Sequence, residues 1–542
     1  MLPTPLISLA LSVALVSPGM AMDDAALAAK LASRLDGDRT GACFAAAVID
    51  AGGVSRAVAC ADPDRAGKLD AATAFEIGSV SKTFNGLLLQ QLVEAGKLSL
   101  DDPAERHLPE GVSLSRHGEA PITLRHLLTH TSGLPSLAPG WQIRDPSNPY
   151  RDIDRKALYA GLDGLRPRRA PGEAFEYSNL GAMLLSDIIG RVAGKHFDAL
   201  VAEQVFAPLG MRSFVGKPPK GVERVTGHLP NGESTSAWDF DPALAGVGGV
   251  RASLDDMVRY LEAQMGRRES PLDASIRASQ QPVHVEGQPP MAMGWMIAPL
   301  NGARVLAHEG GTGGFSSFVA FRADRSRGVV VLSDTAMTSL GGLGSVGLHL
   351  LDERVPLGEP RRVASPPVEL LDKLAGDWRL EGGLKMSLRQ RDGALEIQAE
   401  GQPAFEMRYD SAGDFYPLAF DAVLRPQVNG ERVGFIWLQG GAATPASRIE
   451  AGVPTAEAAA LADYAGRYPL MPGFALKVFV ENATLMAQAT GQGAFALAPA
   501  GEDVFRADAF GIEIRFDRGE DGAVRRLALH QGGQVMRGER NE

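Results

Sequence analysis

The stretch that decides the fold runs from residue 74 to residue 84 and reads AFEIGSVSKTF, and the apolar run LLLQQL follows at 87–92. Ser79 and Lys82 are three residues apart, so at the start of a helix their hydroxyl and amine lie on one face, one turn apart. A helix N-terminus also points backbone N–H groups and a partial positive charge at the serine, which suits an oxyanion. Burial or a nearby cation lowers the pKa of a lysine from about 10.4, and its amine can then accept the serine proton.

Four letters recur by chance in many proteins, so the prediction of a nucleophilic serine depends on segments further along the chain. The segment FEYSNLG at 175–181 precedes a predicted helix at 182–192. A tyrosine two residues before an asparagine in a tight loop, here Tyr177 and Asn179, presents a phenol and an amide side by side. The segments LLTHTSGLP at 127–135 and GGVRASLDDM at 248–257 flank this region.

A glycine-rich stretch, VLAHEGGTGGF at 305–315, follows a predicted strand at 302–307. Glycine at such a strand end lets a substrate lie close to the backbone and leaves N–H groups free for an oxyanion hole. Two further strands, at 316–322 and 329–333, are predicted to pair as an antiparallel hairpin. Helices are predicted at 201–209 and 254–265, so strands at both ends with helices between them indicate an antiparallel sheet flanked by helices.

The three motifs S-x-x-K, Y-x-N and H-x-G, in this order, resemble the serine β-lactamase-related family. That family includes class C β-lactamases, penicillin-binding DD-peptidases, bacterial D-aminopeptidases and a group of carboxylesterases. The resemblance covers roughly residues 71–334 and implies an α/β sandwich, with an antiparallel sheet between helices and an additional all-α subdomain. Tyr177 and Asn179 would belong to that subdomain.

The resemblance also implies a role for each motif residue. Ser79 would be the nucleophile that forms an acyl-enzyme, and Lys82 would lower the barrier to its deprotonation. Tyr177 would be the second proton carrier, which protonates the leaving group and activates water for deacylation. Asn179 would hold both the substrate amide and the Lys82 amine. The backbone N–H groups of Ser79 and Gly311 would form the oxyanion hole.

The third motif departs from the pattern of class C β-lactamases, because His308-Glu309-Gly310 stands where those enzymes have Lys-Thr-Gly. A fixed positive charge becomes a titratable one at His308, and the Thr hydroxyl that helps to bind the β-lactam carboxylate is absent. Gly310 is expected to lie against the substrate. The H-x-G form is found in D-aminopeptidases and in some DD-peptidases and esterases.

The function predicted from these motifs is a serine hydrolase that acts on small amides, peptides or esters, most closely a D-aminopeptidase. The alternatives are a carboxylesterase with weak β-lactamase activity, and a non-catalytic sensor similar to penicillin-binding proteins. The predicted catalytic residues are Ser79, Lys82, Tyr177 and His308. No cofactor is expected.

The chain has 542 residues, and five segments are predicted. They are a signal peptide at 1–21, a catalytic domain at 22–352, a Pro-rich linker at 353–368, and two small all-β barrel domains at 369–455 and 456–542. Two barrels after the catalytic domain are also an architecture that the bacterial D-aminopeptidase has. These domains could bind substrate, cover the cleft or mediate oligomerisation, for example in a homodimer.

An internal repeat with an offset near 90 residues is the basis for the two barrels. LAGDW at 374–378 matches YAGRY at 464–468, and GQPAF at 401–405 matches GQGAF at 491–495. The sequence QGG also recurs, at 439–441 and 531–533. Two copies of one small β domain account for this pattern.

Charge and cysteine usage indicate the compartment and exclude some partners. The net charge is −11 without a long Lys/Arg cluster, which argues against nucleic acid or an anionic membrane as a partner. The apolar run 6–16 and small residues at 19–21 are typical of a secretory signal, which predicts a periplasmic or secreted protein without a membrane span in the mature chain. A predicted hairpin turning at Ala51-Gly52 sets Cys43 opposite Cys60, within reach of a disulfide.

Two other patterns have competing interpretations. His126 and His130 have the i,i+4 spacing of a zinc pair on a helix, but no Glu stands beside the first His and no third ligand is obvious, so a buried structural turn is the preferred interpretation and no metal is predicted. Trp141, Trp238 and Trp295 lie in loop-like segments, where they either line the cleft or pack as ordinary core residues.

Overall fold

The computed structural model describes most of the chain in two compact units, Met1–Arg448 and Ile449–Glu542. The described residues are 21–118, 120–381, 383–430, 432–439, 442–449, 461–471, 474–481, 484–490, 494–507, 511–531 and 534–541. The predicted signal peptide therefore lies outside them except for Ala21, as do the predicted boundary between 455 and 456 and parts of the second repeat copies. Among the described residues, no helix has both the length and the apolar composition needed to cross a membrane.

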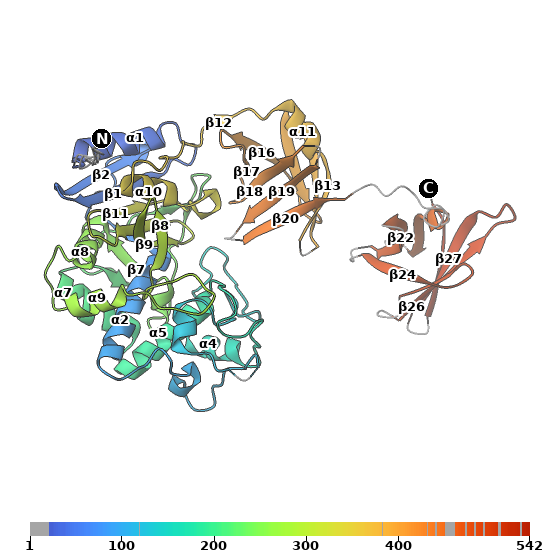
Figure 1. Cartoon of the computed structure of the whole chain (residues 1–542). Coiled ribbons are helices and arrows are strands. Elements are labelled where there is room, and N and C mark those ends of the chain that lie inside the picture. The colour runs from blue at the N-terminus through green and yellow to red at the C-terminus, as the bar shows by residue number, and fades with distance from the viewer. Residues whose placement is uncertain are drawn as a thin grey trace, which may run out of the picture. The chain divides into compact units, whose positions relative to one another are not determined.

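The first unit is built on a six-stranded antiparallel sheet in the order β2-β1-β11-β10-β9-β8 (Figure 1). Its strands come from both ends of the segment, as the sequence predicted. They are β1 (Cys43–Asp50), β2 (Gly53–Cys60), β8 (Met296–Leu300), β9 (Ala303–Gly311), β10 (Ser316–Arg322) and β11 (Gly328–Ser333).

Helices cover both faces of this sheet, because its central strands are apolar on both sides. In β1, the alternate residues Phe44, Ala46 and Val48 pack in one core with α1 and α10, while Ala45, Ala47 and Ile49 pack in another with α2 and α8. The helices are α1 (Asp24–Leu35), α2 (Ser81–Glu94), α8 (Leu254–Gln264) and α10 (Gly344–Leu351). This arrangement confirms the predicted α/β sandwich.

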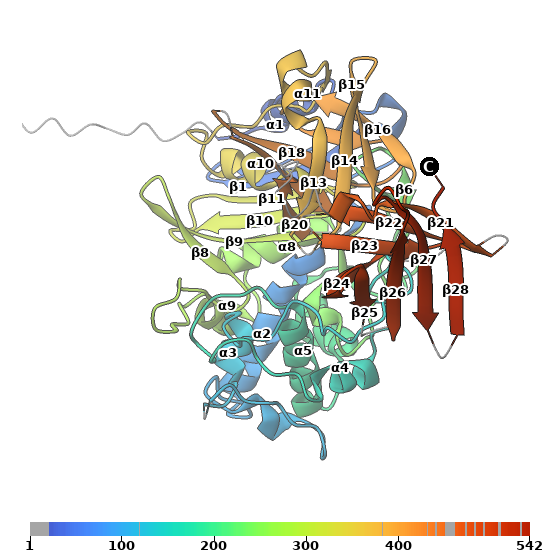
Figure 2. The ribbon, with the colours of Figure 1, turned by 90° about the vertical axis from the view of Figure 1, so that its right-hand side faces the viewer.

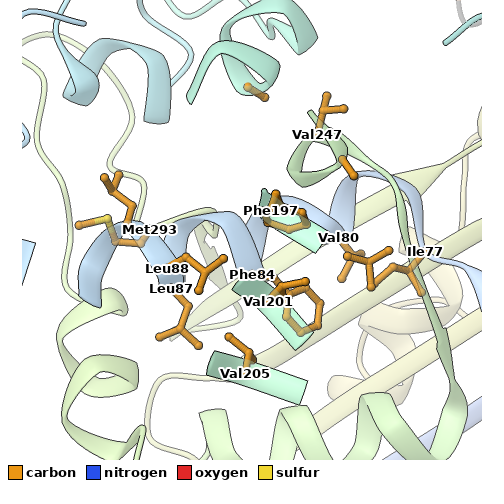
Figure 3. Packing of buried hydrophobic residues seen from close by; sticks show 14 of the residues in the cluster. Ile77, Val80, Phe84, Leu87, Leu88, Phe197, Val201, Val205, Val247 and Met293 are labelled. Carbon is orange, nitrogen blue, oxygen red and sulfur yellow. The ribbon is translucent and has the colours of Figure 1, made fainter. Parts of the chain in front are cut away.

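The helical subdomain packs around α2, which is buried along almost its whole length. Figure 3 shows Phe84 of α2 beside Val201 and Val205, and its ring stacks on Tyr260 with centroids 4.2 Å apart. The remaining helices are α3 (Leu124–Leu128), α4 (Arg155–Leu162), α5 (Asn179–Ala193), α6 (Phe197–Val201), α7 (Ala207–Leu209) and α9 (Asp273–Ser279). The helix predicted at 201–209 is interrupted, because a π-helical turn at Ala202–Phe206 joins α6 to α7.

Two small sheets complete this part of the chain. The strands β3 (Ala74–Glu76), β7 (Val250–Ser253) and β4 (Phe214–Val215) form one, and β5 (Gly227–His228) pairs with β6 (Ser234–Thr235) in the other. Because β3 leads directly into Ser79 and β7 follows Val247, the first of these sheets connects two segments of the site described below.

Eight strands after the α/β part close into a barrel within the first unit. They form an antiparallel meander (Figure 2) in which β13 pairs with β20. The strand β12 adds to β16 from outside the ring. The elements are β12 (Val363–Ala364), α11 (Val368–Leu374), β13 (Gly376–Leu380), β14 (Lys385–Arg391), β15 (Ala394–Ala399), β16 (Ala404–Asp410), β17 (Phe415–Pro417), β18 (Val423–Asn429), β19 (Arg432–Gln439) and β20 (Ala442–Arg448).

The second unit is another antiparallel meander of eight strands, and a bridge between Arg467 and Asn541 joins its first and last segments. The strands are β21 (Gly466–Met471), β22 (Phe474–Glu481), β23 (Thr484–Ala489), β24 (Ala494–Gly501), β25 (Val504–Ala507), β26 (Ile512–Arg518), β27 (Val524–Gln531) and β28 (Gln534–Glu539). The two all-β barrels predicted from the repeat are confirmed.

Matching residues of the repeat have the same structural role in both barrels. Trp378 and Tyr468 are fully buried at the first strand of each barrel. The Trp378 indole donates to the carbonyl of Leu374 at 2.9 Å, and the Tyr468 hydroxyl donates to the carbonyl of Tyr464 at 2.9 Å. Each aromatic residue thus anchors the segment that precedes its barrel, which explains why this part of the repeat is recognisable in the sequence.

A buried ion-pair network joins the first barrel to the α/β part. The Arg39 guanidinium lies 2.9 Å from Asp410 and stacks on the ring of Tyr416. Arg361, from the predicted linker, lies 3.2 Å from Asp410 and 2.8 Å from Asp414. Removing one partner of such a network leaves an uncompensated buried charge, so these contacts fix how the barrel packs on the α/β part.

The hairpin of β1 and β2 turns at Ala51-Gly52, as predicted, and places Cys43 directly opposite Cys60. The two side chains are joined in a disulfide. It lies at the end of the hairpin opposite the turn, where it links an edge strand to the centre of the sheet.

Replacing both cysteines by alanine should lower the free energy of unfolding by about 3 kcal/mol, because the cross-link joins residues 17 positions apart and restricts the unfolded chain. Urea unfolding of the full chain measures this difference, with reduced wild-type protein as the control. An unchanged unfolding midpoint in the double variant, against wild-type protein whose mass shows the disulfide, would contradict the expectation.

Candidate active site

Ser79 lies in a 3₁₀ turn, Gly78–Val80, that runs directly into α2 at Ser81. Gly78 has a φ of +48°, and a Cβ there would lie 2.6 Å from the carbonyl oxygen of Gly311 on β9. Only glycine combines this backbone conformation with so close an approach. The turn therefore brings Ser79 against the end of β9.

The Lys82 amine is buried and points at three acceptors. Its Nζ lies 2.9 Å from Ser79 Oγ, 3.0 Å from Asn179 Oδ1 and 2.7 Å from the carbonyl oxygen of Val247. The side chain makes no ion pair with a described carboxylate. Burial without a compensating negative charge lowers the pKa of Lys82 to about 7.

The three partners of Lys82 differ in whether they can also donate a hydrogen bond, and this difference decides where the lone pair of the neutral amine points. The Val247 carbonyl and the Asn179 Oδ1 atom can only accept hydrogen bonds, so they take the two N–H groups of a neutral amine. Ser79 Oγ–H is the one partner of the three that can donate. The lone pair of neutral Lys82 is therefore left for the Ser79 proton.

Tyr177 is the second titratable group in contact with the serine. Its hydroxyl hydrogen-bonds to Ser79, and the Lys82 Nζ sits 4.9 Å from the centre of its ring. Burial raises the pKa of Tyr177 to about 12, so the phenol keeps its proton at neutral pH. Ser79 thus contacts both a basic amine and a phenol that can donate a proton.

Capping interactions at the start of α5 hold Tyr177 and Asn179 in place. The Ser178 hydroxyl accepts a hydrogen bond from the Gly181 N–H at 2.9 Å, as an N-cap does, and Asn179 is the first residue of the helix. The Ser178 N–H donates to His130 Nδ1 at 3.2 Å, and the His130 ring packs on that of Tyr177 with centroids 4.3 Å apart.

The segment His308–Gly311 belongs to β9 itself, because this strand runs four residues beyond the predicted strand end. His308 faces Lys82 and its Nδ1 lies 2.7 Å from the Gly294 carbonyl, which can only accept, so Nδ1 carries the proton. Burial, together with the Lys82 charge, lowers the pKa of His308 to about 3. The titratable charge expected at this position is thus absent at neutral pH, and Nε2 presents a lone pair.

Alternation along β9 sends Glu309 to the opposite face, where it accepts a hydrogen bond from the Leu343 N–H at 2.5 Å. Glu309 is therefore not beside Ser79, although it lies between two residues that are.

Two backbone N–H groups converge near the serine. The Thr312 N–H donates to the Phe315 carbonyl, so Thr312 and Phe315 form a hydrogen-bonded pair of the β9–β10 ladder. Such pairs alternate along antiparallel strands, and the next one is Gly310 with Ser317. The Gly311 N–H between them therefore points away from β10. The Ser79 N–H belongs to a helical N-terminus, where the first N–H groups have no intrahelical acceptor. A Cβ on Gly310 would lie 3.0 Å from the Ser79 nitrogen, so both segments meet here. The pair has the composition of an oxyanion hole.

The structure brings Ser79, Lys82, Tyr177, Asn179 and His308 together, with Gly310 and Gly311 alongside. His126 and His130 do not lie on one helix, because α3 ends at Leu128, and their rings bond to different backbone segments. In the part of the chain that the structure describes, no group of three or more His, Cys, Asp or Glu side chains could hold a metal ion.

Sequence reasoning missed two contributors to the site. Val247 is the last residue of a short 3₁₀ turn, Ala245–Val247, and the sequence of this segment does not indicate that its backbone oxygen accepts a hydrogen bond from Lys82. Tyr150 was not singled out, yet its hydroxyl accepts a hydrogen bond from Asn179 Nδ2 at 3.1 Å. Of the three tryptophans, Trp295 is a core residue with no exposed surface, while Trp238 packs on Tyr150 with the ring planes tilted at 49°.

Comparison with known proteins gives the family. A profile of the family described as Beta-lactamase matches residues 22–339, more than half of the chain. The chain therefore belongs to this family, and it is a serine hydrolase by class. A second profile, described as Domain of unknown function (DUF3471), matches residues 450–540, which include the second barrel.

Curated relatives match in the same part of the chain. The D-alanyl-D-alanine-carboxypeptidase/endopeptidase AmpH of Escherichia coli (strain K12) is 29% identical over 267 residues, which are 46% of this chain and 68% of AmpH. Protein flp of Staphylococcus aureus (strain MW2) is 26% identical over 267 residues, 47% of this chain and 51% of flp.

Solved structures resemble more of the chain. The octameric penicillin-binding protein homologue from Pyrococcus abyssi is 21% identical with a TM-score of 0.49, covering 85% of this chain and 96% of its own. A D-stereospecific amidohydrolase from Streptomyces sp. is 24% identical with a TM-score of 0.47, covering 57% of this chain and 94% of its own.

The pKa of Lys82 predicts how Ser79 reactivity depends on pH. The neutral amine is the form that can accept the serine proton, so the rate of Ser79 labelling by a fluorophosphonate should rise with pH through about 7 and level off above it. The labelling rate is measured from pH 5 to pH 9.5 by quenching the reaction at fixed times, and Ser79→Ala with the same probe gives the blank. A labelling rate that stays flat over this range would show that Lys82 does not activate Ser79.

Proposed function

We propose that this protein is an exported hydrolase that works through a Ser79 acyl-enzyme on small amides, peptides or esters, with D-aminopeptidase activity first. The observation that carries the proposal is the arrangement of Lys82. Its amine is buried, has no carboxylate partner among the described residues, and leaves its lone pair to the hydroxyl of Ser79.

In the acylation step, neutral Lys82 takes the proton of Ser79 Oγ as this oxygen bonds to the substrate carbonyl carbon. The carbonyl oxygen becomes an oxyanion, which the N–H groups of Ser79 and Gly311 stabilise. When the bond to the leaving group breaks, Tyr177 gives its proton to the leaving nitrogen or oxygen, and the Lys82 ammonium returns a proton to the phenolate. Lys82 is then neutral again and the acyl group is held on Ser79.

Deacylation uses the same groups in reverse. A water molecule attacks the acyl carbonyl as Tyr177 takes the water proton and passes its own phenolic proton to neutral Lys82. The bond to Ser79 Oγ then breaks, and Oγ receives this proton as the acid product leaves. Asn179 keeps Lys82 in place through both steps, since its Oδ1 atom accepts from Nζ.

The state of His308 supports an amine-bearing substrate over a carboxylate-bearing one. A neutral imidazole supplies no positive charge for a terminal carboxylate, whereas the lone pair on Nε2 can accept a hydrogen bond from a substrate ammonium or amide N–H. An aminopeptidase recognises such an N–H next to the scissile bond.

Carboxylesterase activity is the second candidate. It is favoured by the absence of a described carboxylate beside His308, since an ester substrate needs no partner for an ammonium group. Weak β-lactamase activity would accompany it, because β-lactams acylate the same serine without the Lys-Thr-Gly contacts.

Export is supported by the disulfide between Cys43 and Cys60, because such bonds persist in oxidising compartments and are rare in the cytosol. The predicted signal peptide at 1–21 agrees with this inference. We place the protein in the periplasm or outside the cell.

A substrate panel tests the proposal on the mature full-length protein. D-alanine p-nitroanilide should be cleaved roughly 10-fold faster than its acetylated form, because an ammonium donates a charge-assisted hydrogen bond to His308, which is stronger than one from the amide N–H that acetylation leaves. The panel also contains a p-nitrophenyl ester, nitrocefin and an acetylated peptide ending in D-Ala-D-Ala. Ser79→Ala is the blank and should abolish every activity in the panel, so turnover surviving this change would refute the mechanism.

The other outcomes select among the candidates. Ester cleavage alone would assign the protein as a carboxylesterase, and release of D-alanine from the acetylated peptide would assign a carboxypeptidase. Absence of all turnover and of fluorophosphonate labelling would leave a non-catalytic sensor.

A further inference from the structure

Three aromatic rings form a continuous surface beside Ser79, which we call the aromatic wall: Tyr150, Trp238 and Phe240. Tyr150 stacks on Phe240 with ring centroids 4.8 Å apart, and lies 5.3 Å from Trp238. Tyr150 is buried, while Trp238 and Phe240 keep part of their surface exposed. The mechanism proposed above uses none of these rings.

The aromatic wall contacts three segments of the candidate active site. The Tyr150 hydroxyl accepts a hydrogen bond from Asn179 Nδ2. The Trp238 indole packs on Gly313, where a Cβ would lie 2.6 Å from Nε1. Atoms of the Phe240 ring lie 3.4 and 3.7 Å from where a Cβ of Gly248 would be.

Phe240 is thereby close to the turn that carries the nucleophile. The same point above Gly248 is 3.7 Å from the backbone carbon of Gly78, the residue that precedes Ser79. An acyl group on Ser79 therefore carries its substituent into the neighbourhood of these rings.

Polar contacts hold the aromatic wall in one geometry. Asn148 and Asp239 exchange two hydrogen bonds of 2.8 Å, which fasten the segment before Tyr150 to the segment between the other two rings. The buried ion pair of Glu76 and Arg251, 2.9 Å apart, binds both polar atoms of the Trp238 backbone: the N–H donates to Glu76 and the carbonyl accepts from Arg251. A site held in this way costs little ordering when a ligand binds.

From this geometry we infer that the aromatic wall is the subsite for the acyl-side residue of the substrate, and that it selects an aromatic or large apolar side chain. The inference rests on the proposed function, because it names the substrate class of the same serine. Aromatic rings offer a large apolar surface with offset-stacked and edge-to-face partners, and a methyl group cannot use that surface. Substrates with an acyl-side phenylalanine should therefore be preferred over those with alanine.

The test compares kcat/KM for the p-nitroanilides of D-phenylalanine and D-alanine. Wild-type protein should prefer D-phenylalanine by roughly 10-fold or more. Trp238→Leu should reduce this ratio at least 5-fold, with fluorophosphonate labelling of Ser79 kept, which shows that the variant is folded and reactive. Trp141→Leu is the matched control, because Trp141 is a loop tryptophan that bonds to Ala157 outside the aromatic wall, and it should keep the wild-type ratio.

Tyr150→Phe separates the ring from the hydroxyl. It keeps the aromatic surface, so the D-phenylalanine preference should persist even where kcat falls through the lost contact with Asn179. A wild-type ratio near one, or a wild-type ratio retained in Trp238→Leu, would overturn the inference.

The proposed function can fail separately. If neither anilide is cleaved while Ser79 is still labelled, the aminopeptidase proposal is wrong. The test of the inference then uses the p-nitrophenyl esters of phenylacetate and acetate in place of the two anilides. The same ratios, in the same variants, then decide the inference, because these esters also differ only on the acyl side.

Discussion

A lysine amine buried against two carbonyl oxygens is the constraint on which the rest of the site depends. Two of the three acceptors of Lys82, the Val247 carbonyl and Asn179 Oδ1, cannot give a proton, and the third is the serine. An exposed lysine would be protonated at neutral pH, and a lysine paired with a carboxylate even more firmly so. Burial without a counter-charge is what makes this amine a base, and the lone pair is directed because the other acceptors are occupied.

The fold meets this requirement with close backbone approaches that only small residues allow. Gly78 lets the turn before α2 touch Gly311, and Gly86 lets α2 lie against the backbone of Met293, where a Cβ would be 2.4 Å from its carbonyl oxygen. These contacts bring α2, β9 and the segment before Trp295 around one point. The same packing excludes water from around His308. The position that carries a fixed charge in class C β-lactamases is therefore neutral in this protein.

Much of this arrangement could be predicted from the sequence, because the motifs have side chains whose chemistry is specific. Ser79, Lys82, Tyr177, Asn179 and His308 were all found from three short patterns, and the hairpin of Cys43 and Cys60 from alternation and a turn. The two barrels followed from the repeat, since Trp378 and Tyr468 anchor them in the same way.

The remainder depended on long-range packing that local patterns do not encode. Val247 contacts Lys82 through its backbone carbonyl, so its side chain gives no indication of this contact. Tyr150 contacts Asn179 from a segment that is itself bonded through Asn148 to Asp239, 91 positions further along the chain. His308 is neutral because it is buried, and the residue type alone is compatible with a charged ring.

The most direct test of the account is an NMR titration of the Lys82 side chain in full-length protein labelled with ¹³C at lysine Cε, with Lys82→Met identifying the signal. This signal should titrate with a pKa of about 7, well below the value of about 10.4 that is usual for a lysine side chain. A Lys82 signal that titrates at the usual value would contradict this expectation, because the amine would then be protonated whenever the enzyme met its substrate.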